Sequence, residues 1–213
     1  MHSTVRRLLF DLSARPVGQH ARRFVVSWPD AEPVWAARLG RGTSFLTIPI
    51  GDGQVYCYCD GPVVAGPPPP LRTLLDGYAE PVPTLLDALE AAGPGAKVHS
   101  GPIEEVALAS WSSGPVVLIG DAAYATLPNM AEGAAMALED AIVLAESLDS
   151  ADTTGTAVHA FEARRRPRTD WVLTKTHHRD RTRTLPTGIR NLVLRLNGTR
   201  IYRAHYKPLR ARP

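Results

Sequence analysis

A glycine–aspartate pair after an apolar run is the part of this chain whose residue types could bind a ligand. Gly120 and Asp121 follow residues 115–119, which read PVVLI. In an open α/β sheet, ligands bind beyond the carboxyl ends of the strands, so this pair occupies a position that could contact a bound nucleotide. The Asp121 carboxylate has about four lone-pair sites and could accept hydrogen bonds from sugar hydroxyls. It could equally cap its own turn, a common role for Asp after Gly.

A helix rich in small residues is expected to follow this pair. It begins near Glu132 or Gly133, after Pro128 and Asn129, and continues through residues 134–141. The first N–H groups of a helix lack partners and carry about half a positive charge, so they favour an anionic or electron-rich ligand edge. The alanines could also serve close packing of the helix against a sheet. Both roles can hold together.

Two kinds of strand are predicted to position these residues. Residues 115–119 form a short, continuous apolar run, which is typical of a strand buried on both faces of a parallel sheet. Residues 43–50 and 54–59 instead predict an antiparallel hairpin, because a glycine-bearing turn of three residues, 51–53, joins them. Residues 103–108 are expected to form a strand that leads towards the glycine–aspartate pair.

The remaining periodic segments predict helices. Residues 71–78 and 83–92 form two of them, after a stiff connector that contains four consecutive prolines. Residues 156–165 predict a helix with a kink or break at Pro167, and residues 171–183 predict another. In residues 189–196, four apolar side chains recur at helical spacing and form a stripe that should pack on something.

Composition indicates an ordinary globular protein. The chain has 213 residues, of which 44% are hydrophobic, enough for one large domain or two small ones. No apolar run approaches the roughly 18 residues of a membrane span, and no signal peptide is evident. We therefore expect a soluble, cytoplasmic protein without a membrane partner. Cys57 and Cys59 are expected to be reduced thiols on one strand, and the scattered histidines suggest no metal site.

The net charge of +3 hides an asymmetry between the two ends of the chain. Residues 1–163 carry 9 Lys and Arg against 19 Asp and Glu, whereas residues 164–213 carry 15 against 2. A basic end can bind nucleic acid, but no nucleic-acid motif accompanies it. We expect no nucleic-acid partner, and instead expect the basic end to dock on the chain's own acidic surface or on a partner.

A family resemblance adds to this interpretation. Residues 120–146, GDAAYATLPNMAEGAAMALEDAIVLAE, resemble the second flavin-contacting motif of the FAD-dependent aromatic hydroxylases, the single-component flavoprotein monooxygenases of the para-hydroxybenzoate hydroxylase type. Residues 40–60, 103–111 and 161–172 resemble that family's substrate-domain strands, the strand before the motif and the helix after it. The resemblance implies an α/β (α+β) fold: an incomplete FAD/NAD(P)-binding fold with an antiparallel substrate-domain sheet and C-terminal helices.

The resemblance also implies an organisation and a cofactor site. Residues 1–70 would be part of a substrate-binding β domain, 71–150 the returning helices and FAD-binding segment, and 151–213 basic helices. Asp121 would contact the ribose of FAD, and the segment from Pro128 onwards would lie beside the isoalloxazine ring. The implied FAD-binding residues are Gly120, Asp121, Pro128, Asn129, Met130, Ala131, Glu132, Gly133 and Ala134.

The family's chemistry is hydroxylation of an aromatic or polycyclic small molecule. Members reduce FAD with NAD(P)H and transfer one atom of O₂ through a flavin C4a-hydroperoxide, while the protein supplies orientation and excludes water. No catalytic side chain is assigned to this chain. Phe45, Thr47 and Tyr56 are candidate pocket residues in the hairpin, with packing on a sheet face as an equal alternative.

Three departures from the family pattern limit this expectation. Tyr124 stands where the family commonly has His, and Glu132 where it commonly has Gln; a carboxylate there would oppose the charge of reduced flavin unless it points to solvent. No G-x-G-x-x-G occurs in the chain. We therefore expect a carboxyl-terminal portion of such an enzyme, inactive alone. The alternatives are a degenerate, non-enzymatic module, a module completed by a partner chain that carries the Rossmann half, and a flavin-dependent halogenase or reductase.

Overall fold

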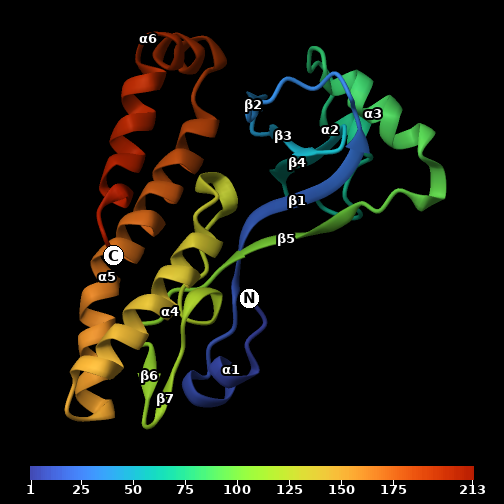
Figure 1. The fold of residues 1–213 in the computed structure, drawn as a ribbon. Helices are drawn as coiled ribbons and strands as arrows, with labels where there is room; N and C mark the ends of the chain where they lie inside the picture. The colour runs from blue at the N-terminus through green and yellow to red at the C-terminus, as the bar shows by residue number, and fades with distance from the viewer. The chain divides into compact units, whose positions relative to one another are not determined.

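The structure is a computed structural model that describes the backbone of residues 1–213 and every side chain except that of residue 184. Contacts divide the chain into two compact units, which we call the sheet unit (Val17–Ile103) and the helical unit (Met1–Pro16 with Glu104–Pro213). The strands (Figure 1) are β1 (Arg15–Ser27), β2 (Ala36–Leu39), β3 (Ser44–Gly51), β4 (Gln54–Pro62), β5 (His99–Glu105), β6 (Ser112–Ser113) and β7 (Val116–Val117). The α-helices are α1 (Thr4–Phe10), α2 (Leu71–Leu74), α3 (Val82–Ala91), α4 (Gly133–Ser150), α5 (Thr154–Arg181) and α6 (Thr187–Tyr206). The 3₁₀-helices are η1 (Gly93–Gly95), η2 (Gly120–Ala122), η3 (Pro128–Met130), η4 (Thr182–Thr184) and η5 (Lys207–Arg210).

The predicted hairpin is present in the sheet unit. β3 and β4 pair antiparallel, with Gly51 opposite Gln54, in a sheet of order β2-β3-β4-β1-β5. Asp52 and Gly53 form the turn, which is one residue shorter than predicted, and both have positive φ, 51° and 64°. Positive φ at both central residues is the geometry of a type I′ turn, whose twist matches that of a hairpin. The hairpin prediction is therefore confirmed.

Alternate strand residues enter the core of the sheet unit together with α2 and α3. Phe45 and Thr47 are 0% and 3% exposed, so they pack on the core side of β3. Tyr56 lies on the other face of the sheet and is half-buried. Burial raises the pKa of the free Cys57 and Cys59 thiols to about 12, so both are protonated at neutral pH. The core consists of Phe24, Val26, Phe45, Val55, Cys57, Cys59, Leu75, Val82, Leu85, Leu86 and Leu89.

The helices within residues 71–91 thus share one hydrophobic core with the sheet. Our division into segments 1–70, 71–150 and 151–213 stays a prediction about function. The predicted fold class, α/β (α+β) with an antiparallel sheet and C-terminal helices, is confirmed by the elements present.

The helical unit is built around α4 and α5, which lie side by side (Figure 1). The prediction of a break at Pro167 was wrong: α5 continues through it. A proline inside a helix removes one hydrogen bond and crowds the preceding turn. Here the buried face of α5 continues past it, with Phe161 and Arg165 before and Val172 after, all 0% exposed. Packing of this face on both sides of the proline offsets the lost bond.

The parallel strand predicted for residues 115–119 is also absent. Only Val116 and Val117 form a strand, β7, and it pairs antiparallel with β6. Gly114, with φ 54°, and Pro115 form the turn between them. Because this turn folds the apolar run back on its own preceding residues, the run has no parallel neighbour in the described chain. The run nevertheless ends at the glycine–aspartate pair, as expected.

The apolar stripe of α6 remains exposed in this structure. Ile189 and Leu192 are each 58% exposed, and Leu196 is 71% exposed, so the expected packing partner is not among the described residues. Among the residues that the structure describes, no helix is both long enough and apolar enough to cross a lipid bilayer.

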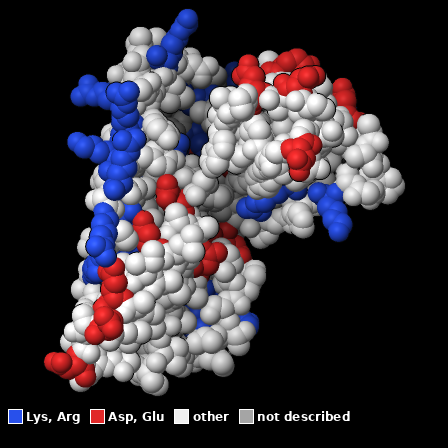
Figure 2. All heavy atoms as spheres, viewed as in Figure 1, with Lys and Arg blue, Asp and Glu red and all other residues white. Residues whose placement is uncertain are grey.

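The basic end of the chain docks in part on the acidic surface of α4, as predicted. Arg164 and Arg212 pair with Glu146, at 2.8 and 2.6 Å, and Arg168 pairs with Glu139 at 2.5 Å. Figure 2 shows the Lys and Arg side chains gathered along the edge formed by the C-terminal helices. Such surface pairs stabilise a protein by at most about 1 kcal/mol each. Together they hold the end of the chain beside α4.

Candidate functional site

The glycine–aspartate pair forms a tight turn, η2, against one side of α4. Gly120 is buried and has φ 54°, and a Cβ atom there would lie 2.9 Å from the Cβ of Ala137. Both the left-handed backbone and the close approach to α4 require glycine. The Gly120 N–H donates to Oδ2 of Asp140, at 2.8 Å. The turn is therefore fastened directly to the helix that follows it.

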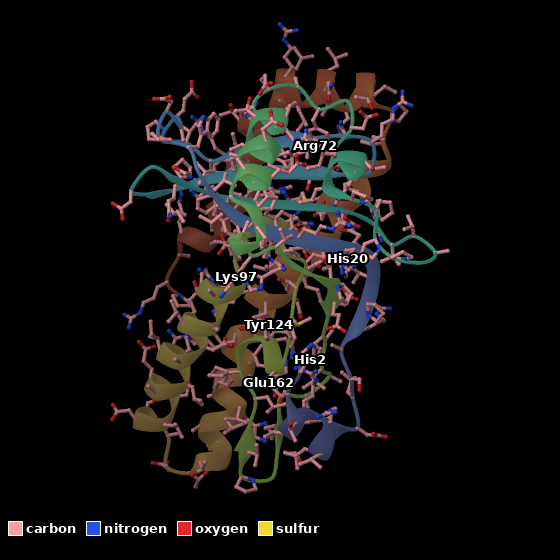
Figure 3. The ribbon with its side chains drawn as sticks, turned by 90° about the vertical axis from the view of Figure 1, so that its right-hand side faces the viewer. His2, His20, Arg72, Lys97, Tyr124 and Glu162 are labelled. Atoms are coloured by element: carbon pink, nitrogen blue, oxygen red, sulfur yellow. The ribbon has the colours of Figure 1, made fainter. Side chains whose placement is uncertain are left out.

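Asp140 is the centre of a buried network. Its side chain is 0% exposed and accepts hydrogen bonds from the Tyr124 hydroxyl at 2.5 Å and from Nε of Arg165 at 2.7 Å. Nη1 of Arg165 donates to Glu139 at 2.7 Å. Burial, with the hydrogen bond to Asp140, raises the pKa of Tyr124 far above its ordinary value, so its hydroxyl is a permanent donor. Tyr124, labelled in Figure 3, thus acts as structural support for the turn.

Asp121 projects out of this network. Its side chain is 55% exposed, with the N-terminal amine 3.6 Å from Oδ2. Oδ1 lies 3.9 Å from the position that a Cβ on Gly133 would occupy. Among the described residues, no hydrogen bond joins this carboxylate to the backbone of its own turn, so the capping role is not observed. The Asp121 backbone carbonyl accepts a hydrogen bond from the buried Arg6 at 3.3 Å.

A second turn, η3, lies just before α4. Ala131 ends this turn in the left-handed conformation, with φ 57°. A residue other than glycine pays a free-energy cost of about 1–2 kcal/mol to adopt this conformation. The Asn129 side chain donates from Nδ2 to the Thr176 carbonyl at 2.9 Å, and its buried Oδ1 has no partner among the described residues. The Met130 carbonyl accepts a hydrogen bond from the Tyr206 hydroxyl at 3.1 Å. This turn is therefore held by α5 and α6.

The N-terminus of α4 is open between the two turns. Gly133, Ala134 and Ala135 are exposed, and the first turn of the helix contains no acidic residue. Glu132 precedes the helix without capping it and is half-buried. Burial and the neighbouring Glu139 raise the pKa of Glu132, while Arg168 opposes the shift. The unpaired N–H groups thus lie next to a carboxylate that is easier to protonate than usual.

The structure brings some of the predicted site residues together and ties others elsewhere. Gly120, Asp121 and Gly133 converge at the start of α4, whereas Asn129 and Met130 face α5 and α6. Sequence reasoning missed the residues that support both turns. The run of arginines at residues 164–168 was the available signal, but we interpreted it as a basic surface. The missed supports are Arg6, Tyr124, Asp140, Arg165, Thr176, Arg179 and Tyr206.

Comparison with known proteins places this region in a family. A family model described as an FAD binding domain matches residues 76–176. The 2-heptyl-3-hydroxy-4(1H)-quinolone synthase of Pseudomonas aeruginosa is 33% identical over 189 residues, which cover 81% of this chain and 47% of the relative. The aurachin C monooxygenase/isomerase of Stigmatella aurantiaca is 32% identical over 130 residues, 58% of this chain and 33% of the relative. The chain thus spans half or less of the length of these relatives.

A solved structure shares the fold. The structure of Klebsiella pneumoniae HpxO complexed with FAD and uric acid has a TM-score of 0.81 and 22% identity, and the match covers 96% of this chain and 56% of that chain. The matched residues 76–176 include both turns and the start of α4. Residues 76–176 therefore match an FAD binding domain, and the chain is similar to monooxygenases and to an FAD-complexed structure, which supports FAD as the cofactor.

Proposed function

We propose that the η2 turn and the open start of α4 form the part of an FAD site that meets the ribose and the flavin ring. The observation that carries this proposal is the approach of the Asp121 carboxylate to Gly133, at the N-terminus of a helix whose first turn has no acidic side chain. An exposed acceptor beside unpaired N–H donors suits a ligand that has hydroxyl groups and an electron-rich edge.

Each residue of this site would have a distinct role. Asp121 accepts hydrogen bonds from ribose hydroxyls, and Gly133 and Ala134 let the ring edge approach the helix closely. Pro128, Asn129, Met130 and Ala131 border the same edge. Protonation of Glu132 removes a negative charge that would oppose an electron-rich ring.

When bound, FAD would supply the redox chemistry, taking electrons from NAD(P)H and activating O₂. The protein's own residues bind, orient and shield the site from water. We propose an aromatic or polycyclic substrate, because the relatives' names include a quinolone synthase, a urate hydroxylase and an aminohydroxybenzoate monooxygenase. The chain has no G-x-G-x-x-G to hold a pyrophosphate, so we expect weak FAD binding and negligible NAD(P)H oxidation by this chain alone.

The test is titration of the purified chain with FAD, followed by flavin fluorescence. Asp121→Ala should raise the Kd about tenfold or more, because a carboxylate acceptor is lost. Asp149→Ala removes an exposed carboxylate at the far end of α4 and serves as the control. Absence of measurable binding by the unmodified chain, or equal Kd values for the two variants, would contradict the proposed site.

A further inference from the structure

The η3 turn determines where α4 begins, yet it has little local support. It is a single turn, closed by one hydrogen bond from the Ala131 N–H to the Pro128 carbonyl at 3.0 Å. Ala131 adopts the left-handed conformation, which is unfavourable for a residue that has a Cβ atom. The next helical bond, from the Met136 N–H to the Glu132 carbonyl at 2.9 Å, starts immediately afterwards. Any shift of this turn therefore moves the open N–H groups of α4.

Support comes instead from residues far along the chain. The Tyr206 hydroxyl, at the end of α6, donates to the Met130 carbonyl at 3.1 Å. The same hydroxyl accepts a hydrogen bond from Nη1 of Arg179 on α5, at 2.9 Å. A donor polarised by a cation is stronger than a neutral one, because the bonds in such a chain reinforce one another. One turn earlier on α5, the Thr176 carbonyl accepts from Asn129.

We propose that Tyr206 is a positioning residue for the cofactor site: with Arg179, it holds the η3 turn and so sets the position of the first turn of α4. This inference rests on the proposed function, because a role of Tyr206 in positioning the cofactor assumes that the site binds FAD. It does not depend on FAD for its test, because the contacts exist in the chain without a ligand. Arg179 donates to the Tyr206 hydroxyl, which donates to the Met130 carbonyl, so both residues act through the backbone of Met130.

The decisive measurement is amide hydrogen exchange in the chain without FAD. Tyr206→Phe removes the hydroxyl and keeps the ring. It should speed exchange of the Ala131 and Met136 amides about threefold to tenfold, the effect of one lost hydrogen bond, while the unfolding midpoint changes little. Tyr202→Phe is the matched control, since Tyr202 lies 4.7 Å from Tyr206 ring to ring on the same helix and is 57% exposed. It should leave both amides at the wild-type rate.

A second variant keeps the proposal testable should Tyr206→Phe fold poorly. Arg179→Met leaves the hydroxyl in place but removes its charged donor, and it should speed exchange of the same two amides by a smaller factor. Wild-type exchange rates in Tyr206→Phe would overturn the proposal, and so would equal effects of Tyr206→Phe and Tyr202→Phe. If the wild-type chain binds FAD, Tyr206→Phe should also raise its Kd threefold to tenfold. Failure of the wild type to bind FAD would contradict the proposed function while the exchange data still decide this inference.

Discussion

The two turns that flank the start of α4 are held in opposite ways. The η2 turn is fastened by Asp140 and Arg165, both 0% exposed, through hydrogen bonds of 2.7 and 2.8 Å. The η3 turn is held by the side chain of Asn129 and by the hydroxyl of Tyr206. The first support includes the buried Arg6, near the start of the chain, as well as Asp140 and Arg165, whereas the second includes the last α-helix, α6. One side of the candidate site is thus held by buried charged groups, and the other by hydrogen bonds from the Asn129 amide and from the Tyr206 hydroxyl, which itself accepts from Arg179.

This difference has an energetic consequence. Buried ions are stable only while they are paired, so removing one partner of the first network leaves an uncompensated charge. Loss of one neutral hydrogen bond is much less severe, typically about 0.5–1.5 kcal/mol. We therefore expect the η2 turn to be part of the global fold and the η3 turn to be adjustable.

The largest effect is expected at Asp140. Asp140→Ala removes the acceptor that the Gly120 N–H, the Tyr124 hydroxyl and Nε of Arg165 share, and it should lower the free energy of unfolding by about 3–5 kcal/mol. Chemical denaturation measures this change. Glu146→Ala, which removes a partly exposed partner of Arg164 from the same helix, should lower the free energy of unfolding far less, because solvent screens this pair. Similar losses in the two variants would show that the buried network does not hold the turn.

A smaller and opposite effect is expected at the η3 turn. Ala131→Gly relieves a left-handed alanine and should raise the free energy of unfolding by about 0.5–1 kcal/mol, measured in the same way. Ala135→Gly, in the first turn of α4, makes the same chemical change in helical backbone and should lower it by about 0.5–1 kcal/mol. If both glycines destabilise equally, strain at Ala131 is not a property of this turn.

The smallest effect is a pH dependence at Glu132. Its pKa is raised by burial and by Glu139, so the folded state binds the proton more tightly than the unfolded state does. Below the ordinary pKa both states are protonated, and as pH rises through the raised pKa the folded state loses stability relative to the unfolded state. Thermal unfolding should show wild type losing stability relative to Glu132→Gln as the pH rises above 4.5. A difference between the two that does not change with pH would contradict the assignment.

Much of the local structure could be predicted because it depends on neighbouring residues. The turn of Asp52 and Gly53 and the alternation around it specified the hairpin, and the small residues after Glu132 specified the start of α4. Pro167 misled because a proline weakens only one turn, whereas the buried face of α5 on both sides of it decides whether the helix continues. Residues 115–119 misled because an apolar run does not state which strand it pairs with.

The sequence by itself predicted the family resemblance, FAD as the cofactor and the glycines of the candidate site, since each prediction depends on residue types at fixed spacing. Only the tertiary structure decided that Asp140 and Arg165 hold one turn and Tyr206 the other. Arg164 and Arg165 look alike in the sequence, yet the Arg164 side chain is 39% exposed and pairs with Glu146, whereas Arg165 is 0% exposed and pairs with the buried Asp140. The reason is physical: a hydrogen bond is specified by a distance, and residues 76 positions apart acquire a distance only when the chain has folded.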